Sequence, residues 1–108
     1  MKGYLYIGDD RLGEVDFKVI DEGMGAIGGK LDMFPTYEKY KKQIQNLYED
    51  KGIANVEDFD FRIVLWNNTI LKPVGGVGVT DSTEFDEIYV EAAGLHFEII
   101  KEIKSKGS

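Results

Sequence analysis

Apolar and charged residues alternate early in the chain in the way that a β-strand requires. Val15, Phe17 and Val19 are separated from one another by charged residues, and a period of two places all three on one face of a sheet. The alternation predicts a strand over residues 13–20. Neighbouring strands are predicted at residues 3–7 and 24–33. The turns that join them to this strand are predicted at residues 8–10 and 21–23.

The apolar spacing changes to three and four residues after Pro35. Charged and amide residues fill the positions between, which is typical of an amphipathic helix. Thr36 is expected to cap the start of this helix and Gly52 to end it, and the apolar stripe is expected to pack on one face of the sheet. The stripe consists of Tyr37, Tyr40, Ile44, Leu47 and Tyr48.

Strand-like alternation returns after the helix. Residues 59–65 alternate, and Asn67 and Asn68 tolerate the positive φ angles of a tight hairpin, so residues 69–72 are expected to fold back against this strand. A glycine-rich segment containing Val77 and Val79 follows. Residues 87–92 then alternate again and are predicted as a strand.

The last apolar segment, residues 95–103, fits two patterns. Leu95, Phe97 and Ile99 have the spacing of a strand, whereas Leu95, Ile99 and Ile103 have the spacing of a helix. We predict a strand. The order is then βββαββββ, and short connections favour a curved, largely antiparallel sheet with one amphipathic helix packed on it, an α+β fold. A chain of 108 residues is expected to form a single domain, residues 1–108.

Three glycines have the spacing G-x-G-x-x-G of a dinucleotide-binding loop: Gly23, Gly25 and Gly28. That motif works only where a helix starts immediately after it, with its N-terminus facing a pyrophosphate. Here Gly28, Gly29 and Pro35 oppose such a helix, because glycine and proline destabilise a helix interior. We therefore predict strand structure without a nucleotide cofactor, and glycines that serve bends, bulges or close contacts.

The composition excludes several kinds of chemistry. The chain has no cysteine and a single histidine, His96, so thiolate catalysis, disulfides and multi-histidine metal sites are impossible. Ser82 and His96 lack the surroundings of a catalytic pair, and the acidic residues at 81, 84, 86 and 87 miss the spacing of a calcium loop. We predict neither a metal site nor a cofactor, and no enzymatic activity. Without a signal or membrane segment, a cytoplasmic location is expected.

The functional hypothesis is based on the net charge of the chain. Thirteen basic and twenty acidic residues give a net charge of −7, which disfavours nucleic acid and anionic membranes and favours a basic protein partner. The hypothesis is a small acidic binding module, for example an immunity or inhibitor protein that neutralises a basic toxin or nuclease. The alternatives are a small-ligand-binding or enzymatic domain with a cleft lined by the glycine-rich strands, and a structural subunit of a larger assembly. The residues predicted to bind the partner are Glu57, Asp58, Trp66, Asp81, Glu84, Asp86, Glu87 and Tyr89.

Overall fold

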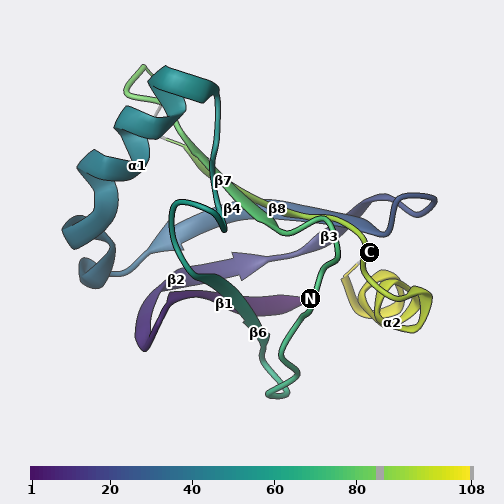
Figure 1. Ribbon diagram of the computed structural model, residues 1–108. Helices are drawn as coiled ribbons and strands as arrows, with labels where there is room; N and C mark the ends of the chain where they lie inside the picture. Colours follow the sequence, from purple (N-terminus) through teal and green to yellow (C-terminus); the bar gives the residue numbers. More distant parts are fainter. Residues whose placement is uncertain (85–86, 108) are drawn as a thin grey trace.

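A computed structural model describes residues 1–84 and 87–107, and it shows an α+β fold built on a curved antiparallel sheet (Figure 1). The predicted fold class is therefore confirmed. The described part of the chain contains the strands β1 (Lys2–Ile7), β2 (Asp10–Asp16), β3 (Lys18–Asp21), β4 (Ala26–Met33), β5 (Ala54–Asn55), β6 (Phe61–Leu65), β7 (Val77–Asp81) and β8 (Ile88–Ala92). Its helices are the 3-10 helix η1 (Pro35–Tyr37), α1 (Glu38–Lys51) and α2 (Phe97–Gly107).

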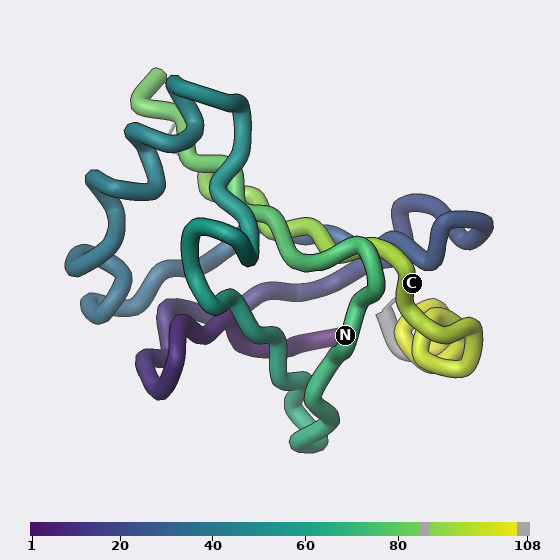
Figure 2. The backbone as a smooth tube through the Cα atoms, in the orientation of Figure 1, coloured from purple at the N-terminus to yellow at the C-terminus, as the bar shows by residue number. Residues whose placement is uncertain are grey.

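The strands form one curled sheet in the order β5-β7-β8-β4-β2-β1-β6, with β3 beside β4. Strand β4 changes partner along its length: Ile27 pairs with Val19 of β3, and Leu31 pairs with Val15 of β2. On its other edge β4 pairs with β8. The tube in Figure 2 shows how the sheet curls, with α1 beyond one end of it and α2 beyond the other.

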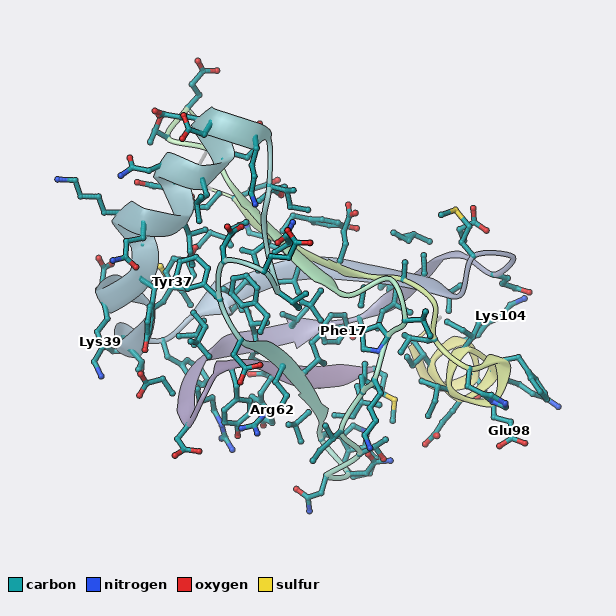
Figure 3. All side chains as sticks on the ribbon, viewed as in Figure 1. Phe17, Tyr37, Lys39, Arg62, Glu98 and Lys104 are labelled. Carbon is teal, nitrogen blue, oxygen red and sulfur yellow. The ribbon has the colours of Figure 1, made fainter. Side chains whose placement is uncertain are left out.

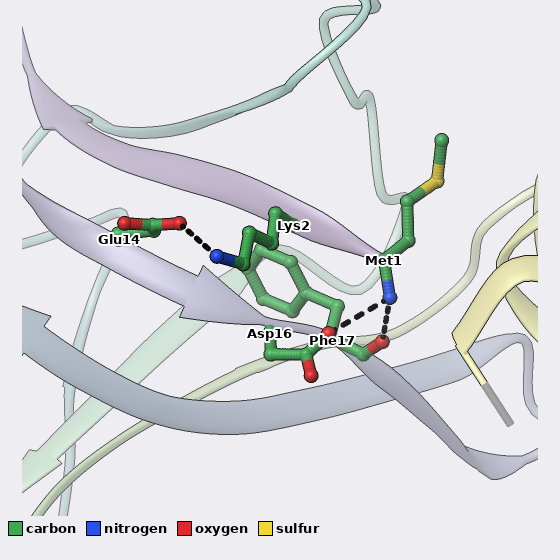
Figure 4. A network of polar contacts seen from close by, with 5 residues as sticks. All are labelled: Met1, Lys2, Glu14, Asp16 and Phe17. Atoms are coloured by element: carbon green, nitrogen blue, oxygen red, sulfur yellow. Dashed lines mark hydrogen bonds and ion pairs between the residues drawn. The ribbon is translucent and has the colours of Figure 1, made fainter.

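The predicted strand at 13–20 is divided into β2 and β3 at Phe17, which is fully buried. The backbone of Phe17 joins the start of the chain: its N–H donates to the carbonyl of Met1 (2.8 Å), and its carbonyl accepts from the Met1 ammonium (2.8 Å). The same ammonium lies 3.0 Å from a carboxylate oxygen of Asp16 (Figure 4). An ion pair between Lys2 and Glu14 (3.2 Å) adds a further link between β1 and β2.

Helix α1 lies where the sequence predicts it, but it begins differently. Thr36 falls inside η1, and neither η1 nor α1 has a side-chain cap at its first turn, so the predicted Thr36 cap is wrong. Pro35 starts a 3-10 turn because its fixed φ suits a first helical position. Gly52 ends α1 with φ of 83°, as predicted.

The prediction of a strand at residues 95–103 is wrong, because most of this segment is α2. The carbonyl of His96 accepts the N–H groups of Ile99 (3.0 Å) and Ile100 (3.2 Å), and the His96 ring accepts the N–H of Glu98 (3.3 Å). A strand would turn Phe97 to the same face as Leu95, yet Phe97 is 69% exposed. Helical spacing instead buries Ile100 and Ile103.

The hairpin predicted after residue 65 forms only in part. Asn68 has φ of 69°, and the Leu65 N–H donates to the Thr69 carbonyl (2.8 Å), so the predicted turn is present. Beyond the turn, Ile70 makes one isolated bridge to Val64. Residues 69–72 therefore run beside β6 without forming a full strand.

The core fills the curl of the sheet and the space beneath both helices. Its fully buried large side chains include Leu5, Leu12, Val15, Phe17, Ile27, Tyr37, Ile44, Ile63, Val79, Val90 and Ile103. Within the described residues, neither helix has the length and apolar character needed to span a membrane.

Candidate functional site

Two acidic segments, residues 55–61 and residues 80–84, each contact the C-terminal turn of α1. The Thr83 hydroxyl donates to a carboxylate oxygen of Glu49 (3.3 Å), which brings the β7–β8 loop onto the helix. On the segment after β5, Asp58 forms an ion pair with Lys51 (2.6 Å). We name this region the acidic end and define it by Glu49, Asp50, Glu57, Asp58 and Glu84. Figure 1 shows the end of α1 and the β7–β8 loop side by side at the top of the molecule.

The C-terminus of α1 adds negative partial charge to the carboxylates of the acidic end, where the Lys51 ammonium pairs with Asp58. The unpaired carbonyls at the C-terminus of a helix carry partial negative charge, and α1 ends here at Lys51. The Lys51 ammonium hydrogen bond lowers the pKa of Asp58, helped by the backbone N–H of Asn55. Asp58 therefore stays ionised to lower pH than an ordinary aspartate.

Asp81 does not belong to this surface. It was predicted to bind the partner, but Asp81 is the last residue of β7 and is only 2% exposed. Its carboxylate accepts hydrogen bonds from the Tyr37 hydroxyl (2.9 Å) and the Gln45 amide (3.3 Å). Burial, together with the negative charge of Asp81, raises the pKa of Tyr37. Figure 3 shows Tyr37 directed from the helical segment toward the sheet. Asp81 is thus a packing residue between α1 and β7.

The other predicted binding residues are dispersed. Trp66 is half exposed and follows β6, and its backbone N–H donates to the carbonyl of Lys2 (3.0 Å). In Figure 1 the hairpin that follows β6 lies at the opposite end of the molecule from the acidic end. Tyr89 lies mid-strand in β8, and Glu87 faces Lys30 of β4 at 3.9 Å. Asp86 lies outside the described residues.

An apolar groove of about 480 Å³ lies on the sheet between the β3–β4 turn and β5. Sequence reasoning missed its exposed apolar residues, because Ile20 and Met24 look like an ordinary strand and turn. The glycine-rich segment at residues 75–78 is the sequence signal that could have located the groove. Its lining consists of Ile20, Asp21, Met24, Ala26, Ile53, Asn55, Gly75, Gly76, Val77, Gly78, Glu91, Ala92 and Ala93. We name this feature the apolar groove.

Two glycines of the G-x-G-x-x-G segment allow other residues to approach the backbone closely. A Cβ on Gly28 would lie 2.7 Å from the Tyr89 hydroxyl oxygen, so the tyrosine ring occupies the space that the glycine leaves. Gly25 has φ of +61°, and a Cβ there would lie 2.5 Å from the carbonyl oxygen of Leu95. The residues after Gly25 form β4, as predicted, in place of the helix that a dinucleotide loop requires.

A polar recess of about 680 Å³ lies between α1 and the ends of β4 and β7. Lys30, Lys41 and the buried Asp81 line it together with Ser82. His96 immediately precedes α2 and Ser82 immediately follows β7. Figure 1 shows α2 and the α1 end of β7 on opposite sides of the molecule, so the two residues do not form a nucleophile–base pair. Among the described residues, no group of three or more histidine or acidic side chains is placed to hold a metal ion.

Searches against protein-family models, curated proteins and solved structures found no match to this chain. Functional inference therefore depends on the acidic end, the apolar groove and the polar recess themselves.

Proposed function

We propose that this protein is a binding module for a basic protein, and that the acidic end is the surface it presents. The observation that supports the proposal is the convergence of two acidic stretches, distant in sequence, on the C-terminal turn of α1. An immunity or inhibitor protein for a basic toxin or nuclease is the kind of protein that fits this chemistry. Complementary charge speeds encounter with such a partner and disfavours acidic competitors.

Reversal of charge at the acidic end tests this function. The variant Glu57→Lys/Glu84→Lys, used as bait in the native cell extract, should lose a basic partner that the wild-type protein retains. The matched control is Asp9→Lys/Glu98→Lys, which makes the same change in net charge at exposed positions on the β1–β2 turn and on α2. Figure 3 places Glu98 on the far side of the molecule from α1.

The outcomes of this test are distinct. Loss of the partner by the first variant alone supports the acidic end as the binding surface. Equal loss by both variants would mean that only net charge matters, and recovery of no partner by the wild-type bait would reject the function. Circular dichroism of each variant establishes that the fold is retained, since exposed substitutions usually change stability by less than about 0.5 kcal/mol.

A second candidate function is the binding of a small ligand in the apolar groove. The volume and apolar lining of the groove are the observations that favour it, because small-molecule sites are concave and mostly apolar. A rise in the melting temperature with an apolar small molecule, such as a fatty acid, would support this alternative.

A further inference from the structure

We infer that the apolar groove anchors the protein partner by taking one of its apolar side chains, flanked in the partner by lysine or arginine. The inference rests on the proposed function and extends it to a second surface. Figure 1 shows the sheet surface between the β3–β4 turn and β7 without a covering helix.

Large apolar side chains surround the groove and remain in contact with water. Ile20 is 50% exposed, Met24 is 64% exposed and Val56 is 44% exposed. Val56 is close to the floor, because a Cβ on Gly76 would lie 3.4 Å from it. Clustered exposed apolar side chains around a concavity are typical of an interaction site.

Glycine backbone forms part of the floor of the groove, and the groove volume of about 480 Å³ is the room available to a side chain from outside. Gly75, Gly76 and Gly78 line it with backbone alone. At Gly78 the space is already used by Ile53, whose Cδ1 would lie 2.3 Å from an added Cβ. At Gly76, with φ of +82°, an L side chain would be strained, so this position adds no side chain of its own to the floor beside Val56.

The charged residues around the groove indicate which kind of partner it would bind. The charged residues among those lining the groove are Asp21 and Glu91, both acidic and exposed. Residues 53–58 connect the groove with the acidic end: Ile53 and Asn55 line the former, and Asp58 belongs to the latter. A second copy of this chain would bring another molecule with charge −7 against these acids, so a basic partner is favoured over self-association.

Strand addition at the β5 edge of the groove is disfavoured, which favours insertion of a side chain there. The outward carbonyl of Asn55 in β5 already accepts the N–H groups of Asp58 (3.0 Å) and Phe59 (3.1 Å). The Asn55 N–H donates to the Asp58 carboxylate (3.2 Å). An incoming strand would find these groups already paired.

The test uses two synthetic peptides with one apolar centre, KKLFLKK and EELFLEE, titrated into isotope-labelled protein and followed by NMR. The lysine peptide should shift the backbone amides of Ala26, Gly76 and Glu91 and bind about tenfold more tightly than the glutamate peptide. Ile20→Ser should weaken the lysine peptide about fivefold or more. Ile70→Ser is the matched control, because Ile70 is 52% exposed, close to the 50% of Ile20, and does not line the groove.

Met24→Ser provides a second groove variant in the β3–β4 turn if Ile20→Ser fails to fold. Absence of binding at millimolar lysine peptide, equal binding of both peptides, or equal effects of Ile20→Ser and Ile70→Ser would overturn the inference. Shifts of the same amides with protein concentration alone, without peptide, would assign the groove to self-association and also overturn it.

The two proposals fail separately. A basic partner that is captured by Ile20→Ser and Met24→Ser as well as by wild type, yet lost on charge reversal at the acidic end, would keep the proposed function and reject the anchor. Peptide binding in the groove without any captured basic partner would keep the anchor chemistry and reject the function.

Discussion

Asp81 illustrates how a residue's surroundings decide its role. Its neighbours in sequence, Ser82, Glu84 and Glu87, are those of a solvated acidic loop. In the structure it is buried under α1, where the Tyr37 hydroxyl and the Gln45 amide supply its hydrogen bonds. A buried carboxylate is tolerated only where donors replace the water that it loses.

Removing the hydroxyl of Tyr37 should therefore destabilise the protein. Tyr37→Phe leaves the buried Asp81 carboxylate with one donor fewer, and we expect a loss of about 1–3 kcal/mol in the free energy of unfolding, measured by urea denaturation. A double-mutant cycle with Asp81→Ala should give a coupling of about 0.5–3 kcal/mol. Tyr48→Phe, at a half-buried position of α1, should change stability by less than about 0.5 kcal/mol, and an equal loss in both variants would contradict this account.

Asp10 should contribute to stability in a pH-dependent way. The hydrogen bond from the Tyr40 hydroxyl (2.5 Å), with Lys39 at 3.6 Å, lowers the pKa of Asp10 below its ordinary value of 3.8. A carboxyl whose pKa is lower in the folded state stabilises the fold above its ordinary pKa and loses that contribution as pH falls through the folded pKa.

The Asp10→Asn variant should consequently lose less stability than wild type on acidification below about pH 4. Melting temperatures measured from neutral pH down to about pH 2 test this. Asp9→Asn, at the adjacent exposed position, is the control and should follow wild type. Parallel curves for wild type and Asp10→Asn would contradict the role given to the Tyr40 bond.

At the scale of elements, α2 is the clearest departure from the sequence prediction. Its apolar residues satisfy a strand pattern and a helix pattern equally well, so local spacing could not choose between them. Two long-range bonds position the segment: the Leu95 N–H donates to the Gly25 carbonyl (3.1 Å), and the Gly94 N–H donates to the Met24 carbonyl (3.0 Å). The helix starts immediately after them and packs near β3.

Two alanine substitutions distinguish the buried face of α2 from its exposed face. Ile103→Ala should cost about 2–5 kcal/mol, because Ile103 is fully buried and truncation leaves a cavity. Phe97→Ala should cost less than about 0.5 kcal/mol, because Phe97 is mostly exposed. Thermal or urea unfolding measures both. A larger loss for Phe97→Ala than for Ile103→Ala would support the strand pattern over the helix.

At the scale of the whole molecule, charge and shape act together. The net charge of −7 gives a field that attracts cations over about 10 Å at moderate salt. The folded chain concentrates part of that charge at the C-terminal turn of α1 and places the apolar groove next to it through residues 53–58. Long-range attraction and then short-range apolar contact would thus act, one after the other, on the same partner.

Association with a basic partner should be fast at low salt and slow as salt rises, because screening weakens steering. Stopped-flow measurements on the captured partner should show an association rate that falls by about tenfold or more between low and high salt, with a smaller change in the dissociation rate. The variant Ile20→Ser should show the opposite division, with faster dissociation and little change in association. A salt-independent association rate would contradict electrostatic capture.

The sequence by itself determined the elements whose signals are local. Alternation at Val15 and Val19, the stripe around Ile44 and the stop at Gly52 predicted strands and a helix that the structure contains, because period and turn chemistry are properties of neighbouring residues. The acidic residues Glu57 and Glu84 can likewise be read directly from the sequence.

Tertiary structure decided the rest. Three features depend on contacts between residues far apart in the chain: the burial of Asp81, the helical state of residues 97–103, and the separation of the hairpin after β6 from the acidic end. The apolar groove likewise exists only because β3, β5, β7 and β8 come together. Such contacts cannot be read from the spacing of apolar residues, because each depends on which faces of distant elements pack together.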